Sequence, residues 1–541
     1  MNRTTLSLIA GATALAAVTG FAAVSAPDVG SATERTGAAA TLPVERTGLL
    51  CPRPSISDLA ETTYTSFTPV TRGAEGEGTA TLRSAAEQSA PDDAATGKGE
   101  KDENDDKDGE QADDGEKGEK DGEKGDKGAE DGKGSAKGGE PDKADKPVLQ
   151  LREPGTPVTA DASGAEAPAL IGTADGRFAS GWTTQQTTEV TAGTGRGLQG
   201  VACTAADTQF WFPGASTDDS RTDYVHLTNP DDSAAVVDIE LYGKNGALKT
   251  TVGEGITVKP RSAEPVLLST LTDEKQTDVT VHVVVRSGRV GAAVQALDDE
   301  LGGDWLPASA DPSGSLVMPG IPKDATGVRL IAFTPGDSDV DLKVRLASPS
   351  GLITPAGNET LHVKGGMTAG FHLGDLTRGE AGSLVLTASD RSVPVVAAVR
   401  VLRGKEGKQE TAFIPAARPV ETRATALDNT AKGTTLSVTS PEGTAQIKVT
   451  ASAGTKGGTP ATKTYTIKSG TTQDIEAPVP AGVKGTYALT VEPQAGTTVY
   501  TSRTLSSTEG GVPFFTVQPL PDDRGMVAVP DASEDLSVLQ R

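Results

Sequence analysis

A few acidic, histidine and aromatic side chains are the residues of this 541-residue chain that could do chemistry. Asp337, Asp339 and Asp341 alternate and could offer oxygen ligands to calcium, although Asp is also favoured in turns for backbone reasons. His362 and His372 flank a turn-like segment, but neither a cysteine nor a His-Glu-x-x-His spacing accompanies them. We therefore predict no metal site and no cofactor.

The densest aromatic group is Phe210, Trp211 and Phe212, and Trp182 precedes it. Aromatic faces could stack on the sugar rings of a cell-envelope polysaccharide, so these four residues form the candidate ligand-stacking site. In the alternative interpretation they belong to a strand whose aromatic side chains fill the core where the first two domains meet. We favour this second interpretation.

No combination of residues indicates catalysis. The chain has no Gly-x-Ser-x-Gly motif, and no glycine-rich phosphate loop follows a strand. Acidic pairs such as Asp298-Asp299 are expected by composition in a chain with 74 Asp and Glu residues, so they nominate no glycosidase dyad. We predict a protein that is not an enzyme and has no catalytic residues.

The formal net charge of −24 disfavours nucleic acid and anionic membranes as partners, because phosphate binding needs clustered Lys and Arg. The sequence does not identify the binding partner. The candidates are a cell-wall glycan or an envelope protein, and contact with a membrane is expected only through the N-terminal apolar segment.

The N-terminus has the pattern of an export signal. A positive tip at Arg3 precedes an uncharged run from Leu6 to Val24, and small residues follow up to Ala26. We predict that residues 1–26 are a signal peptide or, because the apolar run is nearly long enough to cross a bilayer, an N-terminal membrane anchor. Residues 27–41 are the predicted linker. The protein is expected to be secreted or anchored to the cytoplasmic membrane with its domains outside.

Cys51 and Cys203 are the only two cysteines. Outside the cytoplasm such a pair usually forms a bridge, and a reactive or metal-binding pair would need a closer spacing or a neighbouring histidine. We predict a Cys51–Cys203 disulfide that joins the start and the end of the first domain.

A short turn signature containing proline recurs along the chain. It reads Phe67-Thr68-Pro69, Thr228-Asn229-Pro230, Phe333-Thr334-Pro335 and Thr439-Ser440-Pro441. The last three prolines, at 230, 335 and 441, are 105 and 106 residues apart. A polar turn and an alternating run follow each of the three later prolines, so we predict a hairpin in each of four modules.

Two further signatures support the repeat. The segment at 175–180 resembles the one at 287–292, each with a Gly-Arg pair after a polar residue. Near the module junctions the sequence reads Phe212-Pro213-Gly214, Met318-Pro319-Gly320 and Ile414-Pro415-Ala416. Serial domains rather than a solenoid are expected at this repeat length.

Strand-like runs fill the modules. The run from Val340 to Leu346 alternates strictly between apolar and polar residues, as expected for a strand with one buried face. No segment after residue 30 sustains a helical period. The predicted fold is all-β: four tandem immunoglobulin-like antiparallel β-sandwich modules, with a long disordered acidic insertion in the first.

The periodicity also sets the domain boundaries. From Gly97 to Pro147 the chain consists almost entirely of Lys, Asp, Glu, Gly and Ala, and such a composition cannot bury enough apolar surface to offset the entropy of ordering. The predicted boundaries are module 1 at 42–208 with the insertion at about 84–147, module 2 at 209–314, module 3 at 315–411, module 4 at 412–520, and a C-terminal tail at 521–541.

Three motifs together resemble a known family. They are Gly48-Leu49-Leu50-Cys51-Pro52, Phe210-Trp211-Phe212-Pro213-Gly214 and Leu227-Thr228-Asn229-Pro230. With the exported start, they are similar to an actinobacterial family of secreted proteins with a domain of unknown function. The resemblance covers roughly residues 42–520, implies an envelope location and supplies no catalytic residues. The acidic insertion departs from the family pattern.

The function that we expect is that of a non-catalytic exported cell-envelope protein, a scaffold or a binding protein for an unknown ligand. Two alternatives remain open. One is a carbohydrate-active enzyme that uses acidic residues near the junction of modules 1 and 2 to act on envelope glycans. The other is an accessory subunit of an envelope export or glycan-assembly complex.

Overall fold

The computed structural model describes residues 40–87, 146–494 and 496–529. The predicted signal peptide or anchor, most of the predicted linker and insertion, and the end of the tail lie outside the described residues. Contacts divide the chain into two units, Val44–Gly525 and a smaller unit of Met1–Pro43 with Met526–Arg541. In the smaller unit, β1 (Ala40–Pro43) pairs antiparallel with β37 (Met526–Val529). Strands therefore occupy residues that the sequence had assigned to the linker and the tail.

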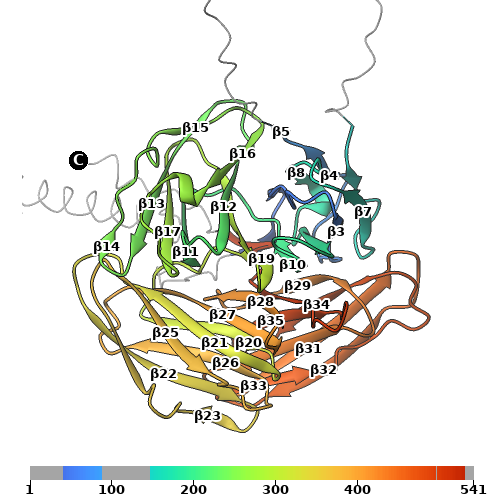
Figure 1. Cartoon of the computed structure of the whole chain (residues 1–541). Helices are drawn as coiled ribbons and strands as arrows, with labels where there is room; N and C mark the ends of the chain where they lie inside the picture. Colours follow the sequence, from blue (N-terminus) through green and yellow to red (C-terminus); the bar gives the residue numbers. More distant parts are fainter. Residues whose placement is uncertain (1–39, 88–145, 495, 530–541) are drawn as a thin grey trace, which may run out of the picture. The chain divides into compact units, whose positions relative to one another are not determined.

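The larger unit consists of antiparallel sheets that follow one another in pairs along the chain (Figure 1). The prediction of an all-β fold built from β-sandwiches is confirmed. Among the described residues no helix is long and apolar enough to cross a membrane. We call the four sheet pairs module 1 (46–202), module 2 (209–306), module 3 (315–415) and module 4 (424–520).

The strands of the first two modules have the following bounds. Module 1 contains β2 (Arg46–Cys51), β3 (Ala60–Phe67), β4 (Ala80–Ser84), β6 (Leu149–Gln150), β7 (Val158–Ser163), β8 (Leu170–Asp175), β9 (Thr183–Val190) and β10 (Gly197–Ala202). Module 2 contains β11 (Gln209–Ala215), β12 (Arg221–Thr228), β13 (Ala235–Gly243), β14 (Gly246–Ala247), β15 (Ile256–Val258), β16 (Ser262–Leu267), β17 (Val279–Ser287), β18 (Gly291–Asp298) and β19 (Gly302–Leu306).

The last two modules are built in the same way. Module 3 contains β20 (Ser315–Ile321), β21 (Ala325–Phe333), β22 (Val340–Ser348), β23 (Gly351–Ile353), β24 (Thr360–Val363), β25 (Thr368–Gly374), β26 (Gly382–Ala388), β27 (Val396–Lys405) and β28 (Lys408–Pro415). Module 4 contains β29 (Ala424–Asn429), β30 (Thr434–Ser440), β31 (Ala445–Gly454), β32 (Ala461–Ile467), β33 (Thr471–Ile475), β34 (Tyr487–Pro493), β35 (Tyr500–Ser506) and β36 (Phe515–Leu520).

All four modules share one strand order. In module 4 the two sheets are β29-β34-β31-β32 and β33-β30-β35-β36, so the first strand pairs with the sixth and the second with the fifth and seventh. Modules 1, 2 and 3 repeat this order, with the fourth strand split into β14 and β15 in module 2 and into β23 and β24 in module 3. In antibody domains the first two strands share a sheet, whereas here they lie in opposite sheets. The strand order therefore differs from that of antibody domains, and the predicted sandwich architecture is confirmed.

The recurrent proline turn follows the second strand in every module, at the ends of β3, β12, β21 and β30. The next strand belongs to the other sheet, so this turn is a corner between the two layers and the predicted hairpin is wrong. Asn229 shows why the residue before proline is polar. Its buried Nδ2 donates to the carbonyl oxygens of Ser233, Val258 and Lys259 and satisfies the backbone of the corner.

Two predicted boundaries also need correction. Ile414 and Pro415 belong to β28, which pairs with β27 and completes module 3, so the boundary after residue 411 is wrong. Phe212-Pro213 and Met318-Pro319 lie instead in first strands, because the same apolar-proline pattern suits either kind of edge strand. Residues 86–87, which the sequence had placed in the insertion, form β5 (Ala86–Glu87) and pair in parallel with β16 of module 2.

The alternating run predicted as a strand is β22. Val340, Leu342, Val344 and Leu346 are buried, while the three residues between them are exposed. These apolar side chains belong to the core of module 3. The alternation therefore places every second side chain between the two sheets, as predicted.

A disulfide joins Cys51 to Cys203 with a Cα–Cα distance of 4.4 Å, as predicted. Cys51 ends β2 in one sheet of module 1, and Cys203 follows β10 in the other sheet. The bond therefore fastens the two layers of the sandwich to each other.

Replacing both cysteines with serine is expected to lower the free energy of unfolding by about 2–4 kcal/mol, because the open chain gains conformational freedom in the unfolded state. Urea unfolding of the variant and of the oxidised parent measures the difference. The parent treated with reductant is the matched control and should behave like the variant. Equal midpoints for the oxidised parent and the variant would contradict a stabilising bridge.

The eighth strands of the four modules contact one another in a closed cycle. β10 contacts β19 and β36, and β28 contacts the same two strands. Apolar side chains pack every module boundary: Val201 with Ala293 and Trp305 between modules 1 and 2, Ala398 and Phe413 in the core of module 2, Phe515 and Val517 in the core of module 3, and Leu198 with Leu505 and Phe514 between modules 4 and 1. Module 1 thus contacts module 4 as well as module 2.

Candidate functional site

The four aromatic residues of the candidate stacking site are all buried, with exposed fractions of 8% or less. Phe210 and Phe212 belong to the core of module 2, and Trp182 belongs to the core of module 1. Trp211 points to the other face of β11 and packs against Phe333 of module 3, with ring centroids 5.5 Å apart. Their burial leaves no ring face open to a sugar, so these residues do not form a stacking site in this structure. The boundary that Trp211 fills is with module 3, not with module 1.

In the acidic cluster of Asp337, Asp339 and Asp341, which was a candidate for calcium binding, the carboxylates of Asp339 and Asp341 contact other groups of the protein. His362 Nδ1 lies 2.9 Å from Asp341 Oδ1, and its Nε2 lies 3.4 Å from Asp339 Oδ2. The other oxygen of Asp339 accepts a hydrogen bond from the Gly365 N–H. Within the described part of the chain, no group of three or more His, Cys, Asp or Glu residues is arranged to hold a metal ion.

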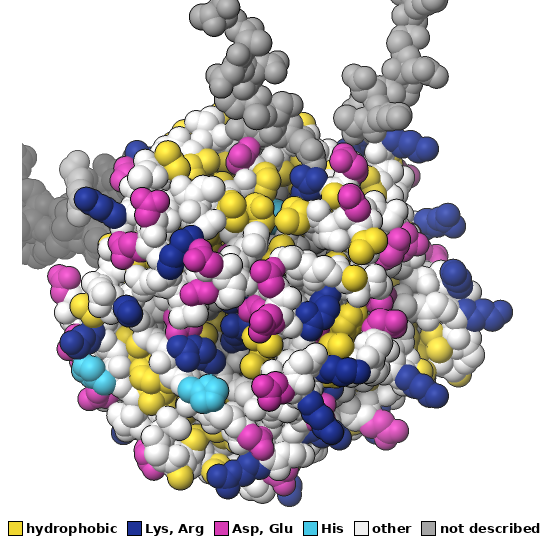
Figure 2. Space-filling view, viewed as in Figure 1, with side chains coloured by type: hydrophobic (Ala, Val, Ile, Leu, Met, Phe, Trp, Pro, Cys, Tyr) yellow, Lys and Arg dark blue, Asp and Glu magenta, His cyan; other side chains and the backbone are white. Residues whose placement is uncertain are grey.

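Most charged side chains lie on the surface, and on the face shown in Figure 2 acidic and basic groups are interspersed. Exposed pairs of this kind, such as Arg418 with Asp311, contribute little to stability because water screens them. Charges buried at the module boundaries are different, since each must be paired or neutralised there. The candidate site therefore consists of buried charges at these boundaries.

A pocket of about 290 Å³ lies between modules 2 and 3. Module 2 contributes residues from β11, β12 and the loop before β17, and module 3 contributes residues from β21 and β27. Its lining includes Gly214, Arg221, Asp278, Arg329, Ile331 and Arg400. We call it the arginine pocket, because three guanidinium groups converge on it.

Arg221 and Asp223 form the innermost ion pair of the pocket. Arg221 Nε and Nη2 donate to the two carboxylate oxygens of Asp223 at 3.0 and 2.8 Å, and both side chains are almost fully buried. Asp223 Oδ2 also accepts the Ser216 N–H at 2.8 Å. Burial raises the pKa of Asp223, while Arg221 opposes that rise by favouring the charged carboxylate.

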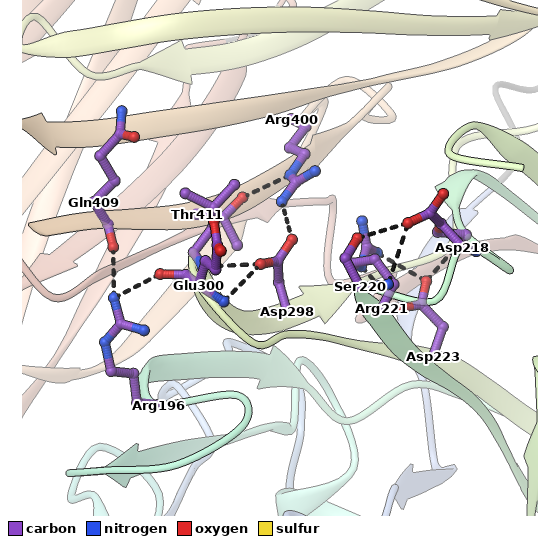
Figure 3. A network of polar contacts seen from close by, with 12 residues as sticks. Arg196, Asp218, Ser220, Arg221, Asp223, Asp298, Glu300, Arg400, Gln409 and Thr411 are labelled. Carbon is purple, nitrogen blue, oxygen red and sulfur yellow. Dashed lines mark hydrogen bonds and ion pairs between the residues drawn. The ribbon is translucent and has the colours of Figure 1, made fainter. Parts of the chain in front are cut away.

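Arg400 links the two modules beside this pair (Figure 3). Its Nη2 donates to Asp298 Oδ2 of module 2 at 2.8 Å, and its Nε donates to Thr411 Oγ1 at 3.0 Å. Burial lowers the pKa of Arg400, and the like charge of Arg221 lowers it further, against the stabilising effect of Asp298. The guanidinium carbons of Arg221 and Arg400 lie 5.4 and 6.0 Å from the centroid of the Phe413 ring, so one aromatic ring adjoins both cations.

Arg329 forms the third pair, with Asp278. Its Nε lies 3.0 and 3.1 Å from the two carboxylate oxygens, and its Nη2 also donates to Asp278 Oδ2. The Arg329 side chain is 36% exposed, so this pair is the most accessible of the three. A Cβ at Gly370 on β25 would collide with both partners, which explains why glycine occupies this position.

Arg196 of module 1 forms hydrogen bonds to modules 2 and 3 near these ion pairs. Its Nη2 donates to the carbonyl oxygens of Glu300 in module 2 at 2.9 Å and of Gln409 in module 3 at 3.1 Å (Figure 3). A single side chain therefore joins backbone groups from two other modules.

The sequence carried one signal for this site. Arg221 and Asp223 are two residues apart in a strand, on the same side as the buried Val225 and Leu227, so two charges continue an apolar face. The pairs Arg329–Asp278 and Arg400–Asp298 gave no such signal, because their partners are 51 and 102 residues apart.

Two carboxyl groups lie where the eighth strands meet. Asp304 on β19 accepts the N–H of Gly200 at 3.0 Å and the hydroxyl of Thr516 at 3.1 Å, and Glu410 lies on β28. Both residues are buried, and Asp304 Oδ2 and both oxygens of Glu410 have no hydrogen-bond partner within the described residues. Burial raises the pKa of Glu410 to about 9 and holds that of Asp304 well above its usual range. In this structure a polysaccharide cannot reach either group.

The fold and the site together define a class of multi-module β-sandwich proteins whose buried ion pairs lie between the modules. Residues 158–478, more than half of the chain, match a family described as a family of unknown function, DUF5719. The chain belongs to this family. The matched segment starts at β7 of module 1 and ends after β33 of module 4, which is shorter than the range expected from the motifs. Comparisons with curated proteins and with solved structures returned no match.

Proposed function

We propose that the chain is an exported, non-catalytic scaffold of the cell envelope that also has a binding role. The observation that supports this proposal best is the closed cycle of eighth strands, because it fixes four sandwiches against one another instead of leaving them as beads on a linker. A rigid assembly of this kind can hold loops and pockets at fixed positions. The all-β fold and a family of unknown function fit such a role.

The disulfide adds support for export. Disulfides persist in oxidising compartments outside the cytoplasm and are rare inside it. The Cys51–Cys203 bond joins the sheets of a single module, which is a structural use of the cysteines rather than a redox one.

Fractionation of cells that produce the full chain tests the proposal. We expect the protein in the medium or the envelope fraction, with an intact mass that increases by two hydrogens on reduction of the single disulfide. Recovery in the cytoplasm with both thiols reduced would contradict export. Release of products from envelope polysaccharides would contradict the non-catalytic part, and co-purification of an integral membrane protein would assign the role of accessory subunit instead.

A further inference from the structure

We propose that the arginine pocket binds a small hydroxylated oxyanion, through the carboxylate of a sugar acid or through a phosphate group. The inference rests on the proposed binding role and names its ligand class. Three features of the pocket carry it: uncommitted donors, size, and an acceptor beside the donors.

The first feature is the set of unused guanidinium donors. Arg221, Arg329 and Arg400 each bond their aspartate or threonine partners through Nε and Nη2, and none of these bonds uses Nη1. Because all three residues line one pocket, a ligand bound there lies beside all three guanidinium groups. Planar guanidinium groups match carboxylate and phosphate oxygens in geometry and charge.

The second feature is the volume. At about 290 Å³ the pocket is at the lower end of the range for small-molecule sites. It therefore suits one sugar-acid ring or a phosphate group rather than an extended polysaccharide strand. A polysaccharide could contribute such a group from a chain end.

The third feature is Asp278. Its carboxylate lines the pocket next to Arg329 and can accept hydrogen bonds from ligand hydroxyls in addition to those from the guanidinium. An anion without hydroxyl groups would meet only repulsion from Asp278, whereas the hydroxyls of a sugar acid or of a protonated phosphate gain an acceptor there. Each arginine already has a neutralising or polar partner, so the pocket is not strongly cationic and the binding should be weak.

Titration calorimetry of the purified full chain with glucuronate and, separately, with inorganic phosphate at constant ionic strength tests the proposal. We expect saturable binding of one molecule with a dissociation constant of about 1 mM, because a ligand of this size has few contacting atoms. Saturation by glucuronate alone identifies a sugar carboxylate as the ligand group, and saturation by phosphate alone identifies a phosphate. Arg329→Gln should weaken binding about 10-fold, since it removes a charged hydrogen-bond donor.

Arg418→Gln is the matched control. Arg418 also pairs with an aspartate and is 39% exposed, but it lies outside the pocket, so binding should not change. The double variant Arg329→Gln with Asp278→Asn separates two roles of Arg329. Binding should stay weak if Arg329 contacts the anion, whereas full recovery would show that it only neutralises Asp278.

Three results would overturn the proposal: no saturable binding of either probe, an equal loss in the Arg418→Gln variant, or full recovery in the double variant. Circular dichroism and thermal unfolding of each variant show whether it is folded. The titration uses purified protein, so its result is independent of export. A cytoplasmic location would refute the proposed function without touching the pocket.

Discussion

Replacing Arg503 with leucine is expected to lower the free energy of unfolding by about 2–5 kcal/mol, because each buried acceptor that loses its donor costs about 1–3 kcal/mol. Arg503 on β35 is fully buried and bonds the Leu427 carbonyl, Gln518 Oε1 and, across the module boundary, Gln185 Oε1 of module 1. Burial lowers its pKa to about 10, which still leaves it charged near neutral pH. Leucine would leave the Leu427 carbonyl and Gln518 Oε1 buried without this donor, whereas Gln185 Oε1 keeps the N–H of Leu427.

Chemical denaturation followed by circular dichroism measures the loss. Arg418→Leu is the control, because Arg418 forms an exposed pair and its removal should change stability by less than about 1 kcal/mol. Adding Gln518→Leu to Arg503→Leu should recover part of the loss, since it removes a carboxamide that the single variant leaves unpaired. A loss for Arg503→Leu no larger than that for Arg418→Leu would contradict the prediction.

The stability of the protein is expected to fall as the pH rises from about 4.5 to about 9, and Glu410→Gln should remove part of this dependence. The pKa of Glu410 is raised from its usual 4.5 to about 9 by burial, with Arg196 opposing the shift and Asp304 adding to it. Between these values the folded protein keeps a proton that the unfolded chain releases. The stabilising contribution of this proton is complete below pH 4.5 and decreases by about 1.4 kcal/mol per pH unit as the pH rises towards 9.

Glutamine resembles the protonated glutamic acid in shape but does not ionise. The variant should therefore match the parent near pH 5 and be more stable than it at pH 8, with the difference growing at each step between. Urea unfolding at a series of pH values measures this difference. Glu75→Gln, at an exposed glutamate, is the control and should give a curve parallel to that of the parent. Parallel curves for Glu410→Gln as well would show that Glu410 is ionised in the folded state.

Local patterns were enough to predict the sheets and the bridge. The alternation from Val340 to Leu346 identified β22 because every second residue of a strand faces the same layer. The Cys51–Cys203 bond followed from the presence of only two cysteines. The proline corners were correctly placed but misread as hairpins, because proline and asparagine favour any tight change of direction and do not specify which sheet receives the next strand.

What the sequence did not show depends on distant contacts. The transfer of β5 to the sheet of module 2 involves two residues with no pattern of their own. The carboxyl group of Glu410 can be buried because Gly197 and Gly302 leave room for it. These three residues meet only through the packing of three modules. In the same way Arg329 and Arg400 resemble ordinary strand residues until Asp278 and Asp298 are placed beside them.

The closed cycle of eighth strands has a consequence for how the protein is made. Module 1 is synthesised first, but one of its two neighbours, module 4, is synthesised last. Until then Leu198, whose partners Leu505 and Phe514 belong to module 4, faces water, as does Phe67, which packs against Leu427 and Ala488. A chain that stops before module 4 therefore exposes an apolar surface on module 1. The nascent protein must be kept from self-association through this surface until module 4 has been synthesised.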